Sequence, residues 1–133
     1  MKKKIIVSMI IVVMSLTMPL GMGIQIIPTE NTEISQAVSY GKQQALKQAK
    51  EYVRVSGISK KFLIEMLIDD GYTKSEAKYG AAHCKANWMK QATRCARQYL
   101  KVSAMSRSEL YEFLRDDGFT KKQANHAVKV VYK

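Results

Sequence analysis

The sequence predicts an all-α protein, with an N-terminal apolar helix followed by two tandem three-helix repeats of the helix–turn–helix kind. The stretch A-L-K-Q-A-K-E-Y-V-R-V-S-G-I-S, which begins at Ala45, recurs without a gap as A-T-R-C-A-R-Q-Y-L-K-V-S-A-M-S from Ala92, 47 residues later. The turn D-D-G-Y-T-K at 69–74 recurs at the same offset as D-D-G-F-T-K at 116–121. A fixed period indicates copies of one unit. The apolar residues follow helical spacing without strand-like alternation, so the unit is predicted to be helical.

The first 27 residues have the features of a signal peptide or an N-terminal membrane anchor. Three lysines follow Met1, residues 5–20 are almost wholly apolar, and the small residues of 21–23 offer a weak cleavage site. If it is not cut, the apolar run through Ile27 is long enough to cross a bilayer core of roughly 30 Å, and we favour this interpretation. Lysines before the span would hold the N-terminus in the cytoplasm and place the body outside the membrane.

The body divides into a linker and two repeats. Residues 28–38 are polar and are expected to form the linker, and the repeats are expected at 39–86 and 87–133. The first helix of each repeat is predicted at about 38–56 and about 88–103. Alanine and tyrosine recur along these helices at helical spacing, which places them on one inward side, while basic residues fall on another side.

The second and third helices of each repeat are predicted from their ends. The second helix begins after Ser59 or Ser106, because a serine hydroxyl can accept a hydrogen bond from a free N–H of the first turn. It ends at Gly71 or Gly118, since glycine adopts the left-handed conformation that closes a helix. The third helix opens with T-K-S-E in one repeat and T-K-K-Q in the other, which are capping-box sequences. The short link between these helices gives helix–turn–helix spacing.

Three features mark the junction between the repeats. Asn87 is expected to cap the helix that follows it. Trp88 stands where the first repeat has Gly41, and is expected to act as a wedge between the repeats. Cys84 and Cys95 are the only cysteines. A disulfide between them would join the repeats and add about 3 kcal/mol of stability; the alternative is that both remain free thiols.

The sequence contains no pattern typical of catalysis or metal binding, so we expect no enzyme activity, cofactor or small-molecule substrate. His83 and Cys84 are neighbours, and on a helix they point about 100° apart. His83 is replaced by Val130 in the second repeat, and His126 by Tyr79 in the first, which is typical of packing or surface positions. Two cysteines and two histidines are too few for a metal framework.

The charge of the chain favours anionic partners. Lysine and arginine number 22 against 11 aspartate and glutamate, for a formal net charge of +11 at pH 7. Phosphate polymers, acidic proteins and lipid headgroups are attracted to such a surface. A basic stripe on the first helix of each repeat is the candidate binding face, and it consists of Lys47, Lys50, Arg54, Arg94, Arg97 and Lys101. The simpler interpretation of the stripe is a solvated helix side.

A second candidate binding set is acidic and consists of Asp69, Asp70, Asp116 and Asp117. These residues lie at the C-terminal ends of the second helices, where a carboxylate opposes the helix dipole. The same unfavourable choice is made in both repeats. It predicts either ion pairs with nearby lysines, such as Lys74 and Lys121, or recognition of a basic segment in a partner.

The order of these elements resembles a known family. The shared features are the A-x-x-x-A-x-x-Y helix, the serine before the second helix, the D-D-G-(Y/F)-T turn, the alanine-bearing third helix and Trp88 at the junction. Together they resemble the host cell surface-exposed lipoprotein family, or Ltp family, of temperate phages and Gram-positive bacteria, over 39–133. The resemblance implies superinfection exclusion, in which a protein at the outer face of the membrane blocks phage DNA injection by contacting a phage protein. The family's lipid-bearing cysteine is missing here, so anchoring would use the N-terminal helix.

Two other functions compete with this one. The first is a general cell-envelope module that binds anionic polymers or the membrane surface through its basic helix faces. The second is a DNA-binding regulator, because helix–turn–helix modules read grooves and basic residues neutralise phosphates. A regulator requires a cytoplasmic body. The N-terminal segment predicts instead a body on the extracellular face of the cell membrane, or secreted if the leader is cut, so sequence-specific nucleic-acid binding is not expected.

Overall fold

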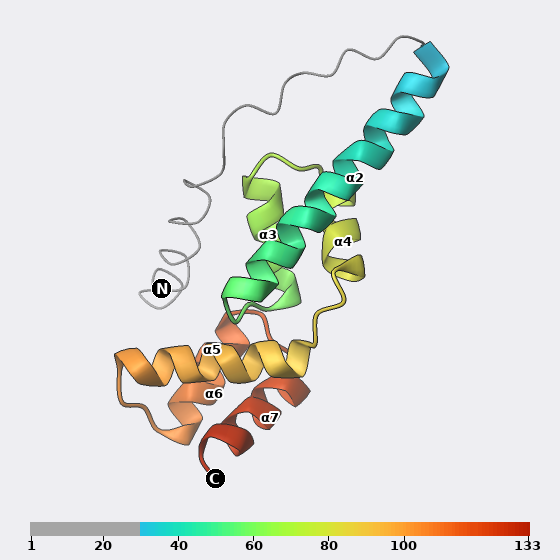
Figure 1. Cartoon of the computed structure of the whole chain (residues 1–133). Helices are drawn as coiled ribbons and strands as arrows, with labels where there is room; N and C mark the ends of the chain where they lie inside the picture. The colour runs from blue at the N-terminus through green and yellow to red at the C-terminus, as the bar shows by residue number, and fades with distance from the viewer. Residues whose placement is uncertain (1–29) are drawn as a thin grey trace.

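The computed structural model describes residues 30–133, with side chains from Tyr40 onward, and the signal or anchor predicted for 1–27 lies outside this part (Figure 1). The described chain consists of six helices without a strand, which confirms the all-α prediction. Within 30–133, each helix is too short or too polar to cross a bilayer. The helices are α2 (Glu30–Val55), α3 (Lys60–Asp69), α4 (Lys74–His83), α5 (Trp88–Val102), α6 (Arg107–Asp116) and α7 (Lys121–Val131).

The helices group into two three-helix units that correspond to the predicted repeats. In the first unit α2 packs against α4 and α3 against α4, and in the second α5 packs against α7 and α6 against α7. The C-terminal end of α2 meets the side of α5 (Figure 1). One boundary differs from expectation: α2 begins at Glu30 rather than near residue 38, so most of the segment 28–38 is the first part of this helix.

The helix ends form as the sequence predicts. Asn87 caps α5 by accepting a hydrogen bond from the Lys90 N–H at 3.1 Å. Ser59 caps α3, and complete capping boxes open the other three short helices, at Thr73, Ser106 and Thr120. Each such cap contributes about 1 kcal/mol. Gly71 and Gly118 have φ of +101° and +96°, the left-handed conformation that lets the chain turn sharply into the next helix.

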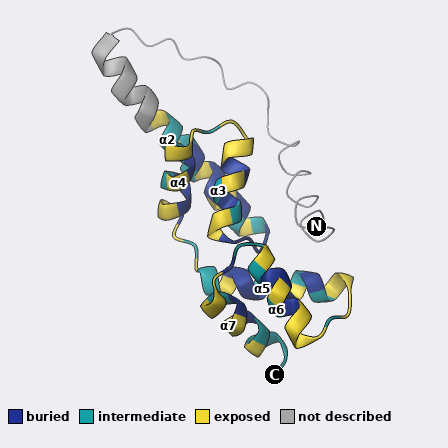
Figure 2. Cartoon of the chain, turned by 180° about the vertical axis from the view of Figure 1, so that it is seen from behind, coloured by how far each residue is buried: buried dark blue, intermediate teal, exposed yellow. Residues whose placement is uncertain are grey.

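The core combines small buried residues on the first and third helices of each unit with larger apolar ones on the second. Ala45 and Ala49 of α2 are fully buried, and so are Leu63 and Leu67 of α3. The close approach of α4 to α2 depends on Gly80, because a Cβ there would lie 2.8 Å from the backbone oxygen of Ala45. Buried residues line the inner sides of the helices in both units (Figure 2). Small residues on α4 therefore allow it to pack closely against α2.

Candidate interaction surface

The side of α5 holds the chain segment that leaves α2. We call residues 56–59, which connect α2 to α3, the repeat 1 corner. Gln91 donates from Nε2 to the Val53 carbonyl at 2.9 Å, and its Oε1 accepts from the Ile58 N–H at 3.1 Å. Gln98 Oε1 accepts from the Gly57 N–H at 3.3 Å. These bonds satisfy backbone groups that the end of a helix leaves unpaired.

Arg94, predicted to belong to the basic stripe, is part of this junction. Its guanidinium donates to the carbonyls of Val53 and Arg54, both at 2.8 Å. A cation at a helix C-terminus is also favoured by the helix dipole. The sequence alone does not distinguish Arg94 from Lys47, its counterpart in the first repeat. In the structure Lys47 is exposed on α2, whereas Arg94 lies at the junction. Arg94 therefore stabilises the contact between the repeats.

The junction leaves no room for a side chain at Gly57. A Cβ built on Gly57 would lie 2.2 Å from the backbone nitrogen of Cys95, so glycine is required there. Ser59 Oγ donates to the Asp117 carbonyl at 2.5 Å. Trp88, predicted as the wedge, is half-buried against the same core, whereas the hydrogen bonds across the junction come from the next turns of α5 and from the α6–α7 turn.

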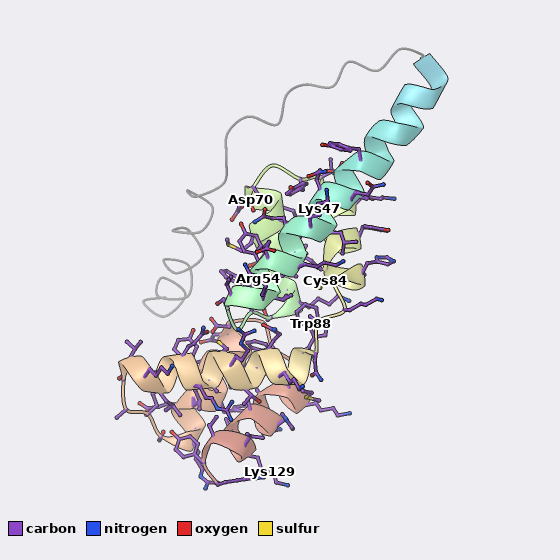
Figure 3. All side chains as sticks on the ribbon, in the orientation of Figure 1. Lys47, Arg54, Asp70, Cys84, Trp88 and Lys129 are labelled. Atoms are coloured by element: carbon purple, nitrogen blue, oxygen red, sulfur yellow. The ribbon has the colours of Figure 1, made fainter. Side chains whose placement is uncertain are left out.

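The rest of the basic stripe lies on the surface. Lys47, Lys50, Arg97 and Lys101 are exposed. Arg54 is exposed as well and forms an ion pair with Glu51 at 2.7 Å, which contributes little to stability at a solvated site. Figure 3 shows Lys47 and Arg54 at successive positions along α2. The stripe is therefore interrupted at Arg94 and is not one continuous basic face.

The second aspartate of each acidic pair bonds to a tyrosine of the first helix. Tyr52 donates from its hydroxyl to Asp70 Oδ2 at 2.5 Å, and Tyr99 donates to Asp117 Oδ2 in the second repeat. Lys74 and Lys121, the lysines considered from the sequence as partners of these aspartates, are exposed at the starts of α4 and α7. Asp69 and Asp116, the first of each pair, are exposed. Each tyrosine precedes its aspartate by 18 residues, and this repeated spacing is the sequence feature that indicates the two bonds.

Both of these tyrosines are held in the neutral form. Burial, and then the hydrogen bond to the aspartate, raise the pKa of Tyr52 and that of Tyr99 well above the usual value. Partial burial raises the pKa of Asp70, and the hydrogen bond from Tyr52 partly offsets this effect. The arrangement therefore makes each tyrosine a neutral hydrogen-bond donor to its aspartate at neutral pH.

The raised tyrosine pKa values predict a loss of stability at high pH. A tyrosine in the unfolded chain ionises near pH 10, whereas Tyr52 and Tyr99 stay protonated in the folded chain. Their contribution is therefore fully present below about pH 10 and is lost as the pH rises above it. We expect the double variant Tyr52→Phe/Tyr99→Phe to lose less stability than the wild type between about pH 9 and 12 in urea unfolding. Parallel stability curves would contradict this assignment.

The cysteines and histidines do not form a reactive group. Cys84 and Cys95 are buried free thiols, so the disulfide considered from the sequence is not formed. Cys84 Sγ donates to the Ala81 carbonyl at 3.4 Å, and Cys95 Sγ lies 3.6 Å from a carboxylate oxygen of the α6–α7 turn. His83 is exposed and stacks on the Tyr79 ring, with ring centroids 4.1 Å apart. In the described part of the chain, cysteine, histidine and acidic residues do not gather into a metal-binding group.

Comparison with known proteins identifies the family to which the chain belongs. The model of the family described as host cell surface-exposed lipoprotein matches residues 41–83 and 87–131, one block in each repeat. The chain belongs to the Ltp family. The fold is also similar to the solved structure of Ltp, a superinfection exclusion protein from the Streptococcus thermophilus temperate phage TP-J34. The two chains are 28% identical, with a TM-score of 0.65, and the match covers 67% of this chain and 93% of the other. A comparison with curated proteins finds no match.

Proposed function

We propose that this chain acts in superinfection exclusion. Held at the outer face of the membrane by its N-terminal segment, the body would bind a protein of an incoming phage that takes part in DNA injection, and DNA entry would stop. The observation that carries the proposal is the match to an exclusion protein over 67% of this chain, at 28% identity and a TM-score of 0.65. Tyr52 and Tyr99, whose pKa values are raised, bond to aspartates within the packed helical body and so stabilise the fold. This role supports a function in binding.

Expression in a phage-sensitive host tests the proposal. Cells that display the chain should adsorb phage normally, while phage DNA inside the cells falls at least about tenfold, as measured by quantitative amplification. A strain with the empty vector provides the reference, and protease treatment of intact protoplasts shows whether the body is displayed outside. Normal DNA entry into cells with full surface display would refute the function. A body protected from protease would refute the location.

Exposed cations support a second candidate, binding of anionic envelope polymers. Lys50, Arg97 and Lys101 are exposed and are free of the junction. Under this alternative, changing these three residues to glutamine should weaken retention of the body on purified wall polymer and lower its dependence on salt. Arg94 must be left intact in this test, because its removal would disturb the contact between the repeats. Retention that is insensitive to these charges would reject the candidate.

A further inference from the structure

The face of α5 that holds the repeat 1 corner has a counterpart on α2, 47 residues earlier. Gln91 corresponds to Gln44, and both can donate and accept through the amide. Arg94 corresponds to Lys47, which keeps the cation, and Gln98 corresponds to Glu51, which keeps an acceptor oxygen. We call Gln44, Lys47 and Glu51 the α2 face. The groups that bind a helix end on α5 are thus present in the same order on α2.

The α2 face is open, whereas the α5 face is covered. Lys47 and Glu51 are exposed and Gln44 is half-exposed. The turns beside the two faces show the same difference. A Cβ on Gly118 would lie 2.9 Å from Ser59 Oγ, but one on Gly71, which has nearly the same φ, would have nothing within 4 Å. In Figure 3, Lys47 lies farther along α2 from the junction than Arg54 does. Repeat 2 uses this surface to hold a corner, whereas the equivalent surface of repeat 1 is uncovered.

We propose that the α2 face is a docking site for a corner of another protein. By analogy with α5, the corner would consist of a helix C-terminus, a glycine in extended or turn conformation, and the serine cap of a following helix. Lys47 would donate to the last carbonyls of the partner helix, and Gln44 would pair with a carbonyl and an N–H beyond it. Glu51, whose Oε2 pairs with Arg54 in the unbound chain, would accept from the N–H of the glycine. The choice of an incoming-phage protein as the natural occupant rests on the proposed function, but the binding capacity of the face does not.

A second copy of this chain does not fit the site. The repeat 1 corner of every copy is already covered by its own α5. The equivalent corner of repeat 2 has Ala104 in place of Gly57, and a Cβ at that place approaches the facing helix backbone to 2.2 Å in the one docked example. Tyr132 also donates to the Met105 carbonyl at this second corner. Copies of this chain therefore do not stack head to tail through these surfaces, and the α2 face is left for a different protein.

The full chain can supply its own probe. The double variant Ala104→Gly/Met105→Ile changes S-A-M-S at 103–106 into the S-G-I-S of the repeat 1 corner. We expect this variant to associate head to tail in sedimentation equilibrium, measured up to about 1 mM because an unlinked contact lacks the millimolar effective concentration of the tethered repeats. The wild type should remain monomeric. Adding Lys47→Glu should weaken association at least about tenfold, and adding Lys50→Glu, on the same helix, should not. A monomeric double variant, or association that survives Lys47→Glu, would overturn the proposal.

A second experiment tests the natural occupant. In cells that show exclusion, Lys47→Glu should restore phage DNA entry at least about tenfold while Lys50→Glu leaves exclusion intact, both at equal display and equal thermal stability. Exclusion that is unaffected by Lys47→Glu would show that the phage protein binds elsewhere. If the wild-type chain does not exclude phage at all, the proposed function fails, and the docking site is then decided by the association experiment alone.

Discussion

Replacing Gly57 with alanine is expected to destabilise the protein by about 3 kcal/mol and to loosen the contact between the repeats. The added Cβ would lie 2.2 Å from the backbone nitrogen of Cys95 and 2.8 Å from the carbonyl carbon of Arg94. Both atoms belong to the middle of α5, so the clash can be relieved only by moving a whole helix. Urea unfolding measures the loss of stability, and the NMR signals of the backbone amides of residues 53–58 report the change at the junction.

The matched control for this variant is Ala104→Gly. It makes the reverse exchange at the equivalent place in repeat 2, where Ala104 is exposed. Because no packing changes, the control should shift the free energy of unfolding by about 1 kcal/mol or less. If Gly57→Ala were as mild as the control, the tight contact between the corner and α5 would be wrong.

Replacing Gln91 with alanine is expected to cost about 1–3 kcal/mol, because the change leaves the buried Ile58 N–H without its partner. The Ile58 N–H bonds to Gln91 Oε1, and Ile58 is buried, so water cannot easily replace the lost bond. The Val53 carbonyl also loses its bond from Gln91 but keeps the one from Arg94. Thermal and urea unfolding of the variant would measure the loss.

The equivalent substitution in repeat 1 separates this effect from the loss of a helix side chain. Gln44→Ala changes the same residue type at the same helix position, but on the open α2 face. It should alter stability by about 0.5 kcal/mol or less. Equal losses for Gln91→Ala and Gln44→Ala would indicate that the two faces are in the same environment, contrary to the structure.

Most of the fold could be predicted from the sequence because its signals are local or periodic. The caps at Asn87, Thr73 and Thr120 require only residues within one turn, and Gly71 and Gly118 mark their turns by residue type. Because the unit is repeated, the serine and threonine caps and the glycine turns each occur twice. The N-terminal limit of α2 was missed because the polar residues of 28–38 suggested a linker, although helix formation depends on neighbouring turns as well as composition.

The candidate surface was harder to predict because the repeats are alike in sequence but not in environment. Gln44 and Gln91 are the same residue at equivalent positions, yet one is half-exposed and the other buried. Nothing local distinguishes Lys47, which is exposed, from Arg94, which bonds across the junction. The clearest signal was the exchange of Gly57 for an alanine in the second copy, since glycine allows another backbone to approach closely.

Backbone hydrogen exchange tests whether the repeat 1 corner, which α5 covers, is better protected than the same corner of repeat 2. The Ile58 N–H bonds to Gln91, whereas its counterpart at Met105 has no such bond in the described structure. We expect the Ile58 amide to exchange at least about a hundredfold more slowly than the Met105 amide, after correction for intrinsic rates. Equal protection at the two positions would contradict the asymmetric junction, and with it the open docking face on α2.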